Sequence, residues 1–330
     1  GGKVTILDSE AYIEDVTIET ALAGVTLQAA SGQSPTIQNA NTRLHANYVA
    51  LGILVADRFG CSVWGPCTIE GINFVNLDGA TNTSSAFGDL TACAMAIHSP
   101  DVVVRNCTMA GPGTGFSGGD WSTVLVISWG DVGIQASAVF ENCEMSGGEY
   151  GLVNETFGQY LPGWTTSFVE ATDCHIHDNT INNVVSDAGI TTLTQCLLDF
   201  AGDNGVAVGG GTTYLVGCDF LQNGQSGIEL DFNASFALPG DWPICYATDC
   251  LLANNQGDSR DISIQIANGR LFIDHSIVTS PANRGGIHMD DNDPAAPCQL
   301  VMDYCDVYTP GLDCFWFDQD VNEHPIEIAI

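Results

Sequence analysis

Residues 104–109 read VRNCTM, residues 140–145 read FENCEM and residues 171–176 read ATDCHI. Each segment sets a cysteine between short apolar positions. The phrase returns around Cys196, Cys218, Cys250 and Cys305, and residues 272–277 (FIDHSI) give a cysteine-free version. Successive phrases are 22 to 36 residues apart. Regular phrases with connections of variable length are typical of a solenoid.

The phrase itself predicts a β-strand, because its side chains alternate and many of its apolar members are β-branched or aromatic. A turn rich in Gly, Asn and Asp follows, and then a second short strand, as at residues 204–208 and 226–230. Glycine before that strand suits a sharp corner with positive φ. A step of 22 residues fits three short strands joined by three corners, whereas helix signals are nearly absent.

The opening of the chain adds a family resemblance. Residues 1–7 (GGKVTIL), 12–18 (YIEDVTI) and 24–28 (GVTLQ) look like the first coils of right-handed parallel β-helix proteins. With the repeated phrase, they make the chain resemble the pectate-lyase-like superfamily. The resemblance implies an all-β fold, a right-handed parallel β-helix solenoid of about eleven coils. It implies no single activity, since this fold carries lyases, hydrolases, epimerases, tailspikes and adhesins.

The repeat also predicts the domain organisation. We expect one parallel β-helix domain over residues 1–330, with N-terminal coils in residues 1–60 and cysteine-bearing coils with loop insertions in residues 61–330. Residues 327–330 (EIAI) look like a strand in mid-course. The natural polypeptide is therefore expected to be longer.

The charge of the chain limits its partners. Forty acidic residues face seven basic ones, a formal net charge of −33, which repels nucleic acid and polyanions. No apolar run approaches the roughly 18 residues of a membrane span. We expect an extracellular or cell-surface protein. The acidity fits a calcium-rich or saline exterior, and it equally fits a solvated surface that keeps open coils from aggregating.

Thirteen cysteines would ordinarily indicate disulfides in a secreted chain. The seven that repeat once per coil are expected to stack inside as buried thiols. Among the others, Cys61 and Cys67 are the preferred disulfide pair. Zinc binding by cysteine is not expected, because the chain has no tight CxxC pair.

Aligning the second strands on their buried positions predicts two outward columns of side chains. The first column is Ala207, Glu229, Ser263, His288 and Trp316, and the second is Gly209, Asp231, Gln265, Asp290 and Asp318. Stacked coils place such residues about 5 Å apart. Polar and acidic members of both columns should therefore share one patch.

Three functions are open to this patch. It can be a carbohydrate site, in which carboxylates act as acid and base and an indole face stacks on a sugar. It can be a cation site that offers oxygen ligands to Ca²⁺, the one cofactor we expect. It can also be a solvated strand face with no ligand. The catalytic candidates are Asp231, Asp290, Asp318 and His288. The carbohydrate-binding candidates are Glu229, Trp316, Trp242 and Trp164. The Ca²⁺ candidates are Asp290, Asp291, Asp293, Asp318 and Asp320.

Family motifs for catalysis are mostly missing. Polygalacturonase-type hydrolases carry Asp-Asp, Gly-His-Gly and Arg-x-Lys elements, of which only Asp290-Asp291 has a match. Residues 272–275 (FIDH) are similar to the Trp-Ile-Asp-His segment of pectate lyases, but the arginine motif of those enzymes is absent. His175 and His177 would face one side of a strand, yet the sequence reveals no further metal ligands beside them.

The chain contains long insertions, which we expect to contact a ligand or a partner, because loops of this length on a rigid scaffold are usually functional. They span residues 75–92, 110–124, 155–168 and 231–245. The main functional expectation is a noncatalytic extracellular structural, surface or filament component or binding module, with copies of itself, other surface proteins or a glycan as partners. The alternative is a carbohydrate-active enzyme, a polysaccharide hydrolase, lyase or epimerase that uses the carboxylate patch. A trimeric phage tailspike is a third hypothesis.

Overall fold

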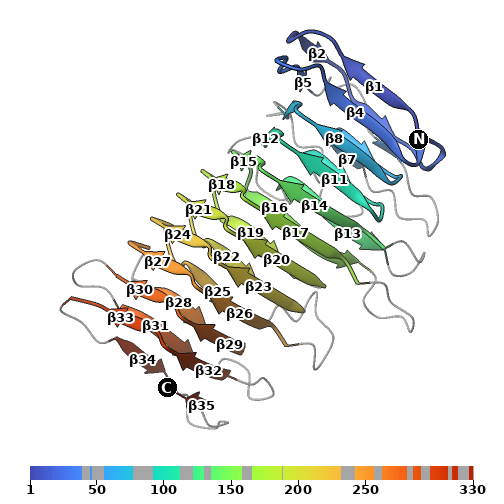
Figure 1. The fold of residues 1–330 in the computed structure, drawn as a ribbon. Helices are drawn as coiled ribbons and strands as arrows, with labels where there is room; N and C mark the ends of the chain where they lie inside the picture. Colours follow the sequence, from blue (N-terminus) through green and yellow to red (C-terminus); the bar gives the residue numbers. More distant parts are fainter. Residues whose placement is uncertain are drawn as a thin grey trace.

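The computed structural model describes most of the chain. The described residues are 1–38, 45–46, 56–76, 92–111, 122–129, 135–157, 166–187, 189–231, 242–255, 262–280, 285–290, 298–310, 314–318 and 327–329. They form an elongated stack of parallel strands, with the N-terminus near one end and the C-terminus near the other (Figure 1). Three parallel sheets run the length of the stack.

Each coil of the stack supplies one strand to each sheet, in the chain order A, B, C. Sheet A contains β1 (Lys3–Ile6), β4 (Val25–Ala29), β8 (Cys67–Glu70), β11 (Val102–Arg105), β14 (Ser137–Glu141), β17 (Phe168–Thr172), β20 (Ile190–Thr194), β23 (Thr212–Val216), β26 (Ile244–Thr248), β29 (Gly269–Asp274), β32 (Cys298–Asp303) and β35 (Glu327–Ala329). Sheet B contains β2 (Ala11–Ile13), β5 (Thr36–Gln38), β9 (Asn73–Val75), β12 (Thr108–Ala110), β15 (Glu144–Ser146), β18 (His175–His177), β21 (Leu197–Asp199), β24 (Asp219–Leu221), β27 (Leu251–Ala253), β30 (Ile277–Thr279) and β33 (Asp306–Tyr308).

Sheet C completes the coils. It contains β3 (Val16–Ile18), β7 (Ala56–Val63), β10 (Ala92–Ile97), β13 (Ser122–Trp129), β16 (Tyr150–Phe157), β19 (Asn182–Ser186), β22 (Val206–Val208), β25 (Ile228–Leu230), β28 (Ile262–Ile266), β31 (Gly285–Asp290) and β34 (Phe315–Asp318). A short strand β6 (His45–Ala46) pairs antiparallel with β7, and a 3₁₀ turn, η1, covers Thr20–Leu22. The expectation of an all-β solenoid of about eleven coils is confirmed by these sheets.

The repeated phrase spans two strands rather than one. In residues 104–109, β11 ends at Arg105 and β12 begins at Thr108, so Asn106 and Cys107 form the corner between sheets A and B. Asn106 has φ 52°, and Asn142 and Asp173 repeat this left-handed conformation in the next two coils. Asn and Asp tolerate that region better than other L-residues. The expectation of a single strand is therefore wrong, and the residue before each of the seven repeated cysteines, which has positive φ in every case, is the corner.

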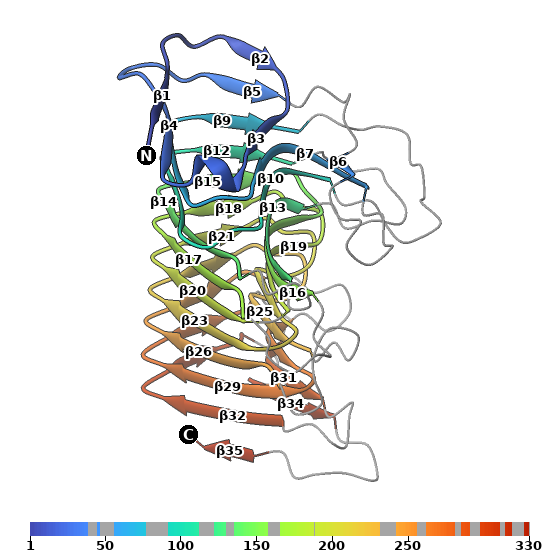
Figure 2. The ribbon, with the colours of Figure 1, turned by 90° about the vertical axis from the view of Figure 1, so that its right-hand side faces the viewer.

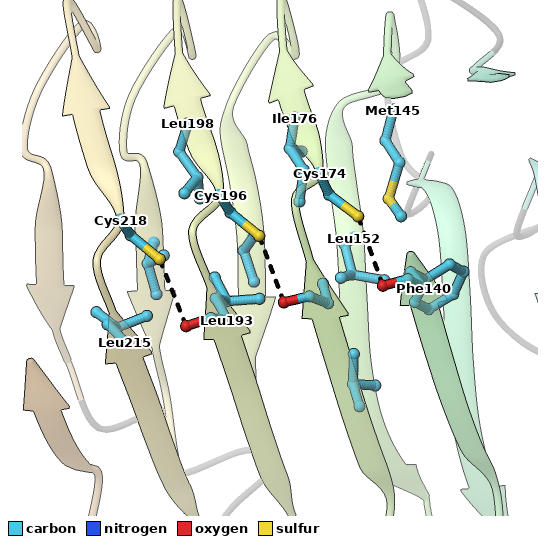
Figure 3. Packing of buried hydrophobic residues seen from close by; sticks show 14 of the residues in the cluster. Phe140, Met145, Leu152, Cys174, Ile176, Leu193, Cys196, Leu198, Leu215 and Cys218 are labelled. Carbon is cyan, nitrogen blue, oxygen red and sulfur yellow. Dashed lines mark hydrogen bonds between the residues drawn. The ribbon is translucent and has the colours of Figure 1, made fainter. Parts of the chain in front are cut away.

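The cysteine of each corner points inward. Cys174, Cys196 and Cys218 lie one coil apart, and each thiol meets a backbone carbonyl of the preceding coil (Figure 3). The sulfur-to-oxygen distances are 3.7, 3.4 and 3.4 Å. Ser276 takes the same corner position in the cysteine-free phrase and donates to the carbonyl of Asp274 at 2.8 Å. A small side chain with one weak donor suits this place, because it fills little volume and satisfies a carbonyl.

All thirteen cysteines are free thiols, so the expected disulfide between Cys61 and Cys67 is wrong. Cys61 lies in β7 and Cys67 opens β8, and both side chains face the apolar interior. Burial raises the pKa of Cys67 to about 12. The pair is thus part of the core rather than an external staple.

The interior between the sheets is one continuous apolar cluster that runs from Ile18 to Met302. Buried asparagines line the corner between sheets B and C. Asn223 is fully buried: its Nδ2 donates to Asn255 Oδ1 at 2.9 Å and to the carbonyl of Leu198 at 3.2 Å, and its Oδ1 accepts from the Ala201 N–H at 3.0 Å. Such amides satisfy backbone groups that corners leave unpaired.

Replacing Asn223 by Ala should lower the free energy of unfolding by about 3 kcal/mol, because it strands several buried donors and acceptors at once. Asn73→Ala is the matched control, since Asn73 Nδ2 makes an exposed bond to Ser34 Oγ at 3.0 Å; its cost should stay below about 1 kcal/mol. Chemical denaturation of both variants measures the difference. Equal losses would contradict the network.

The thiols make a second prediction. In denaturant, all thirteen cysteines should react with a thiol reagent without prior reduction. In the native protein only the two half-buried cysteines, Cys305 and Cys314, should react quickly. The other thiols are buried, which blocks access of the reagent and raises the thiol pKa, to about 11 for Cys107. Fewer than thirteen thiols in denaturant would reveal disulfides and contradict the assignment.

Candidate functional site

Sheet C brings together most of the predicted site residues. One outward row runs across five neighbouring strands, β22, β25, β28, β31 and β34, through Ala207, Glu229, Gln265, His288 and Trp316. Each member pairs directly with the next, so neighbouring residues are about 4.8 Å apart along the stack. The expected neighbourhood of Glu229, His288 and Trp316 is therefore present, although no two of these three lie within 20 residues in sequence.

The predicted alignment of β28 is wrong by two residues. Gln265, not Ser263, stands in the row, because Ile264 and Ile266 take the buried positions opposite the apolar residues of β25. Ser263 is buried and donates to the carbonyl of Thr279 at 3.0 Å. The strand has isoleucine at residues 262, 264 and 266, so a shift by two residues keeps the same alternation and still places isoleucine opposite both apolar residues of β25. Only the pairing between strands distinguishes the two registers.

The second row holds the carboxylates. Asp231 follows β25 directly, and Asp290 closes β31, where it pairs with Asp318 of β34. Burial is the main influence that raises the pKa of Asp231; Asn268 lowers it by hydrogen bonding, and the charge of Asp290 raises it. Asp231 and Asp290 are thus close enough for their negative charges to repel each other across the intervening coil.

Several predicted residues lie outside the described part of the chain. Asp291, Asp293, Asp320 and Trp164 belong to undescribed segments, and for Asp318 only the strand position is described. Trp242 is described: it is half-buried and lies two residues before β26 of sheet A. It therefore stands at the end of the connection that leaves sheet C after Asp231.

Glu229 is the most perturbed carboxyl group of the patch. It is half-buried, and burial first, then the charges of Asp231 and Asp203, raise its pKa to about 7. Each of these influences disfavours the charged form. Near neutral pH, Glu229 is therefore present in both protonation states, which suits a group that gives or takes a proton.

Asn204 fixes the orientation of the Glu229 carboxyl. Its Nδ2 donates to Glu229 Oε2 at 2.6 Å and to Asn182 Oδ1 at 3.1 Å. Its Oδ1 accepts from the backbone N–H of Ser226 at 3.0 Å. Because that amide oxygen is committed to a backbone donor, the amide nitrogen must face the carboxyl. The sequence analysis missed Asn204, since nothing in its local pattern separates it from other corner asparagines.

His288 differs from its expected exposure. It stands in the outward row, but only 2% of its surface is accessible. Trp316 lies over it, with ring centroids 5.4 Å apart and planes at 54°, and Trp316 itself is 44% exposed. The indole is thus the surface that a ligand meets, and the imidazole lies beneath it. A catalytic role for His288 stays a prediction.

The long predicted insertions all adjoin sheet C. Residues 75–92 and 110–124 enter its strands β10 and β13, and residues 155–168 and 231–245 leave its strands β16 and β25. The long connections therefore meet strands of sheet C at both of their ends, whereas from β8 onward the connections between sheets A and B are two residues long. The outer face of sheet C is the face that loops can border.

No family model and no curated protein matches the chain. Similar solved structures include the Dettilon tailspike protein (gp208), with 10% identity and a TM-score of 0.54 over 99% of this chain and 61% of that one. A Streptococcus pneumoniae surface protein and adhesin, PfbA, has 11% identity and a TM-score of 0.49 over 100% and 92%. The catalytic unit of a GH87 α-1,3-glucanase from Streptomyces thermodiastaticus has 12% identity and a TM-score of 0.47 over 100% and 62%.

These comparisons correct the main functional expectation. Besides the tailspike and the glucanase, the matches include the periplasmic alginate epimerase AlgG and the A-module of a mannuronan C-5 epimerase from Azotobacter vinelandii. The main expectation of a noncatalytic structural, surface or filament component or binding module is corrected accordingly, since the named glucanase and epimerases agree better with its alternative, a carbohydrate-active enzyme. The chain spans 61% and 62% of the first two structures.

The described residues include no helix that is long and apolar enough to cross a membrane. At 9–13% identity, the likeness to solved structures concerns the fold. It agrees with the three parallel sheets and with the resemblance in the sequence. The chain is a right-handed parallel β-helix protein.

Proposed function

We propose that the protein is a carbohydrate-active enzyme that hydrolyses a polysaccharide on the outer face of sheet C. The proposal is carried by Glu229. This half-buried carboxyl group has a pKa of about 7 and lies near the carboxyl groups of Asp231 and Asp290. Pairs of carboxyl groups with different environments are what glycoside hydrolysis requires: one donates a proton and the other stays charged.

Glu229 is the proposed general acid. In its protonated form it would donate to the oxygen of the leaving sugar, and the bond from Asn204 would hold the carboxyl in place. Asp290 is the proposed base, which would orient and deprotonate the attacking water. Asp290 lies two strands away from Glu229 and two residues further along the strand direction, so their backbones are about 12 Å apart. This separation favours the arrangement in which a water fits between the carboxyl groups, about 6.5–9.5 Å, over the shorter one for a covalent intermediate.

Trp316 supports binding of a sugar ring. It is 44% exposed at the end of the row that contains Glu229, and an indole face stacks well on the apolar face of a sugar. Trp242, at the edge of sheet A, is a second proposed contact. The long connections that border sheet C would supply further contacts along the chain of the polysaccharide.

The charge of the face favours a neutral glycan. The lysine and arginine side chains that the structure describes, Lys3, Arg105 and Arg270, all lie on sheet A. Lyases and epimerases that act on uronates must neutralise a substrate carboxylate and abstract the proton beside it. A neutral polysaccharide avoids that repulsion, so hydrolysis is the proposed reaction.

The remaining expectations are proposals of lower priority. An extracellular location follows from the polysaccharide substrate. Ca²⁺ at Asp290 and its acidic neighbours is proposed as a ligand rather than a catalyst, because oxygen-rich clusters suit it. Self-association and binding to other surface proteins stay predictions of the sequence.

Activity tests the proposal. The wild type should release reducing ends from at least one neutral polysaccharide in a panel, and Glu229→Gln and Asp290→Asn should each lower kcat by about 10²–10⁴-fold. Glu170→Gln, on an exposed position of sheet A, is the control and should keep full activity. The rate should fall as pH rises through about 7, where Glu229 loses its proton. Unchanged turnover in both patch variants would remove the hypothesis.

The dependence of protein stability on pH tests the raised pKa of Glu229, on which the proposed hydrolysis rests. In the folded protein Glu229 keeps its proton up to about pH 7, whereas the unfolded chain releases it near the ordinary glutamate pKa of 4.5. Folding therefore binds a proton between these values, and this group makes the wild type lose stability as pH rises through them. Glu229→Gln should gain about 2–3 kcal/mol relative to wild type between pH 4.5 and 8.

Thermal unfolding of both proteins at the two pH values measures this effect. The Tm of Glu229→Gln minus that of wild type should increase from acid to alkaline pH, because the amide cannot ionise. Glu170→Gln should show a constant difference. A constant difference for Glu229→Gln as well would mean that the carboxyl titrates normally and would overturn its assignment as the acid.

A further inference from the structure

A second cluster of polar side chains lies on sheet B, away from the carboxylate patch on sheet C. It centres on β18, where Ile176 is buried and His175 and His177 face outward from the sheet. The neighbouring strands are β15 and β21 (Figure 2). Pairing places His177 beside Asp199 and His175 beside Glu144. The additional ligands that the sequence could not reveal thus come from the adjacent coils.

The ligand atoms already converge. His175 Nε2 lies 2.8 Å from Asp199 Oδ1, and one ligand atom each from His175, His177 and Asp199 lies within 4.8 Å of the others. The two imidazole rings stack with centroids 4.0 Å apart and planes at 24°. Asp199 is buried, with 8% of its surface accessible, so its carboxylate has a fixed position and does not rotate freely in solvent.

We propose that His175, His177 and Asp199 bind one divalent transition-metal ion of the zinc type. Two imidazole nitrogens and a carboxylate oxygen form a ligand set that suits Zn²⁺, whereas Ca²⁺ and Mg²⁺ take oxygen ligands. Ligands of a tetrahedral zinc ion lie about 3.3 Å apart, given metal–ligand bonds of about 2.0 Å. The His175–Asp199 pair, at 2.8 Å, would open by about 0.5 Å, and the other separations, which are at most 4.8 Å, would close by up to about 1.5 Å; small rotations of the two rings out of their stacked arrangement supply both changes.

Neighbouring carboxylates orient the ligands. His177 Nδ1 lies 2.7 Å from Asp178 Oδ2, the contact that fixes a ligating imidazole with its Nε2 toward a metal. Glu144 Oε1 lies 3.3 Å from His177 Nε2 and is placed to become the fourth ligand; otherwise water completes the site. The ion would take the position of the hydrogen that now joins His175 to Asp199.

The site would connect successive coils. Glu144, His177 and Asp199 belong to three consecutive strands of sheet B, so one ion would hold together coils that pair there through three-residue strands. The net charge of −33 raises the concentration of cations at the surface. A structural role follows, independent of the proposed hydrolysis, because the two clusters lie on different sheets.

Metal binding by the purified protein tests the inference. One equivalent of Zn²⁺ should bind, by titration calorimetry, and should raise the Tm. Co²⁺ should give the visible absorption of a tetrahedral ion with nitrogen and oxygen ligands. His175→Gln, His177→Gln and Asp199→Asn should each weaken Zn²⁺ binding by about 10–100-fold or more and abolish the rise in Tm.

The control is another histidine–carboxylate pair. His275 Nδ1 lies 2.7 Å from Asp274 Oδ1 on the surface, with a tyrosine rather than a second histidine stacked on it. His275→Gln should leave Zn²⁺ binding unchanged. If the cluster variants fold poorly, NMR of the wild type replaces them: Zn²⁺ should shift the imidazole signals of His175 and His177 and leave those of His275 in place.

Three results would overturn the proposal. These are no stoichiometric binding, unchanged binding in all three variants, or binding that disappears when the accessible thiols are alkylated. The last result, with thiolate-to-cobalt absorption, would assign the ion to Cys305 or Cys314 instead.

Discussion

The left-handed corner between sheets A and B is the constraint on which the structure depends. In coil after coil, a residue with φ near 50° ends the strand of sheet A and turns the chain inward, as at Asn106, Asn142 and Asp173. The next residue then points into the core and the strand of sheet B begins one position later. From β8 onward this corner has a constant length of two residues, so sheets A and B stay in register there whatever the length of the other connections.

Constant register has a consequence for the interior. Residues at equivalent positions stack about 4.8 Å apart, so each buried group meets its own counterpart from the neighbouring coils. Apolar side chains tolerate this arrangement, and cysteine thiols meet carbonyls of the preceding coil, as Cys196 meets Ala171 at 3.4 Å. Amides satisfy each other in the same way, as Asn223 and Asn255 do. The core is therefore both apolar and locally hydrogen-bonded, which burial of polar groups requires.

The same stacking creates the outward clusters. Carboxylates that are remote in sequence meet on sheet C, where repulsion and burial raise the pKa of Glu229. On sheet B, imidazoles meet carboxylates from the coils on either side. The acidic composition of the chain thus acts differently in the two places. On sheet C like charges lie close together and favour protonation, whereas on sheet B imidazoles lie within hydrogen-bond distance of the carboxylates and offer nitrogen ligands. Two independent functions are compatible with one scaffold because the sheets face in different directions (Figure 2).

The sequence by itself determined the repeating coil, the identity of the inward residues and the membership of Glu229, His288 and Trp316 in one row, because alternation and corner residues are local properties. Tertiary structure alone decided the register of β28, where Ile262 and Ile264 are alternatives for the position opposite Ile228, and the division of the cysteine phrase into two strands. It also decided that Trp316 covers His288 and that Asp199 reaches His175. Connections of irregular length separate these residues, so their meeting depends on how coils pair and on what covers them. Neither is encoded in any single stretch of chain.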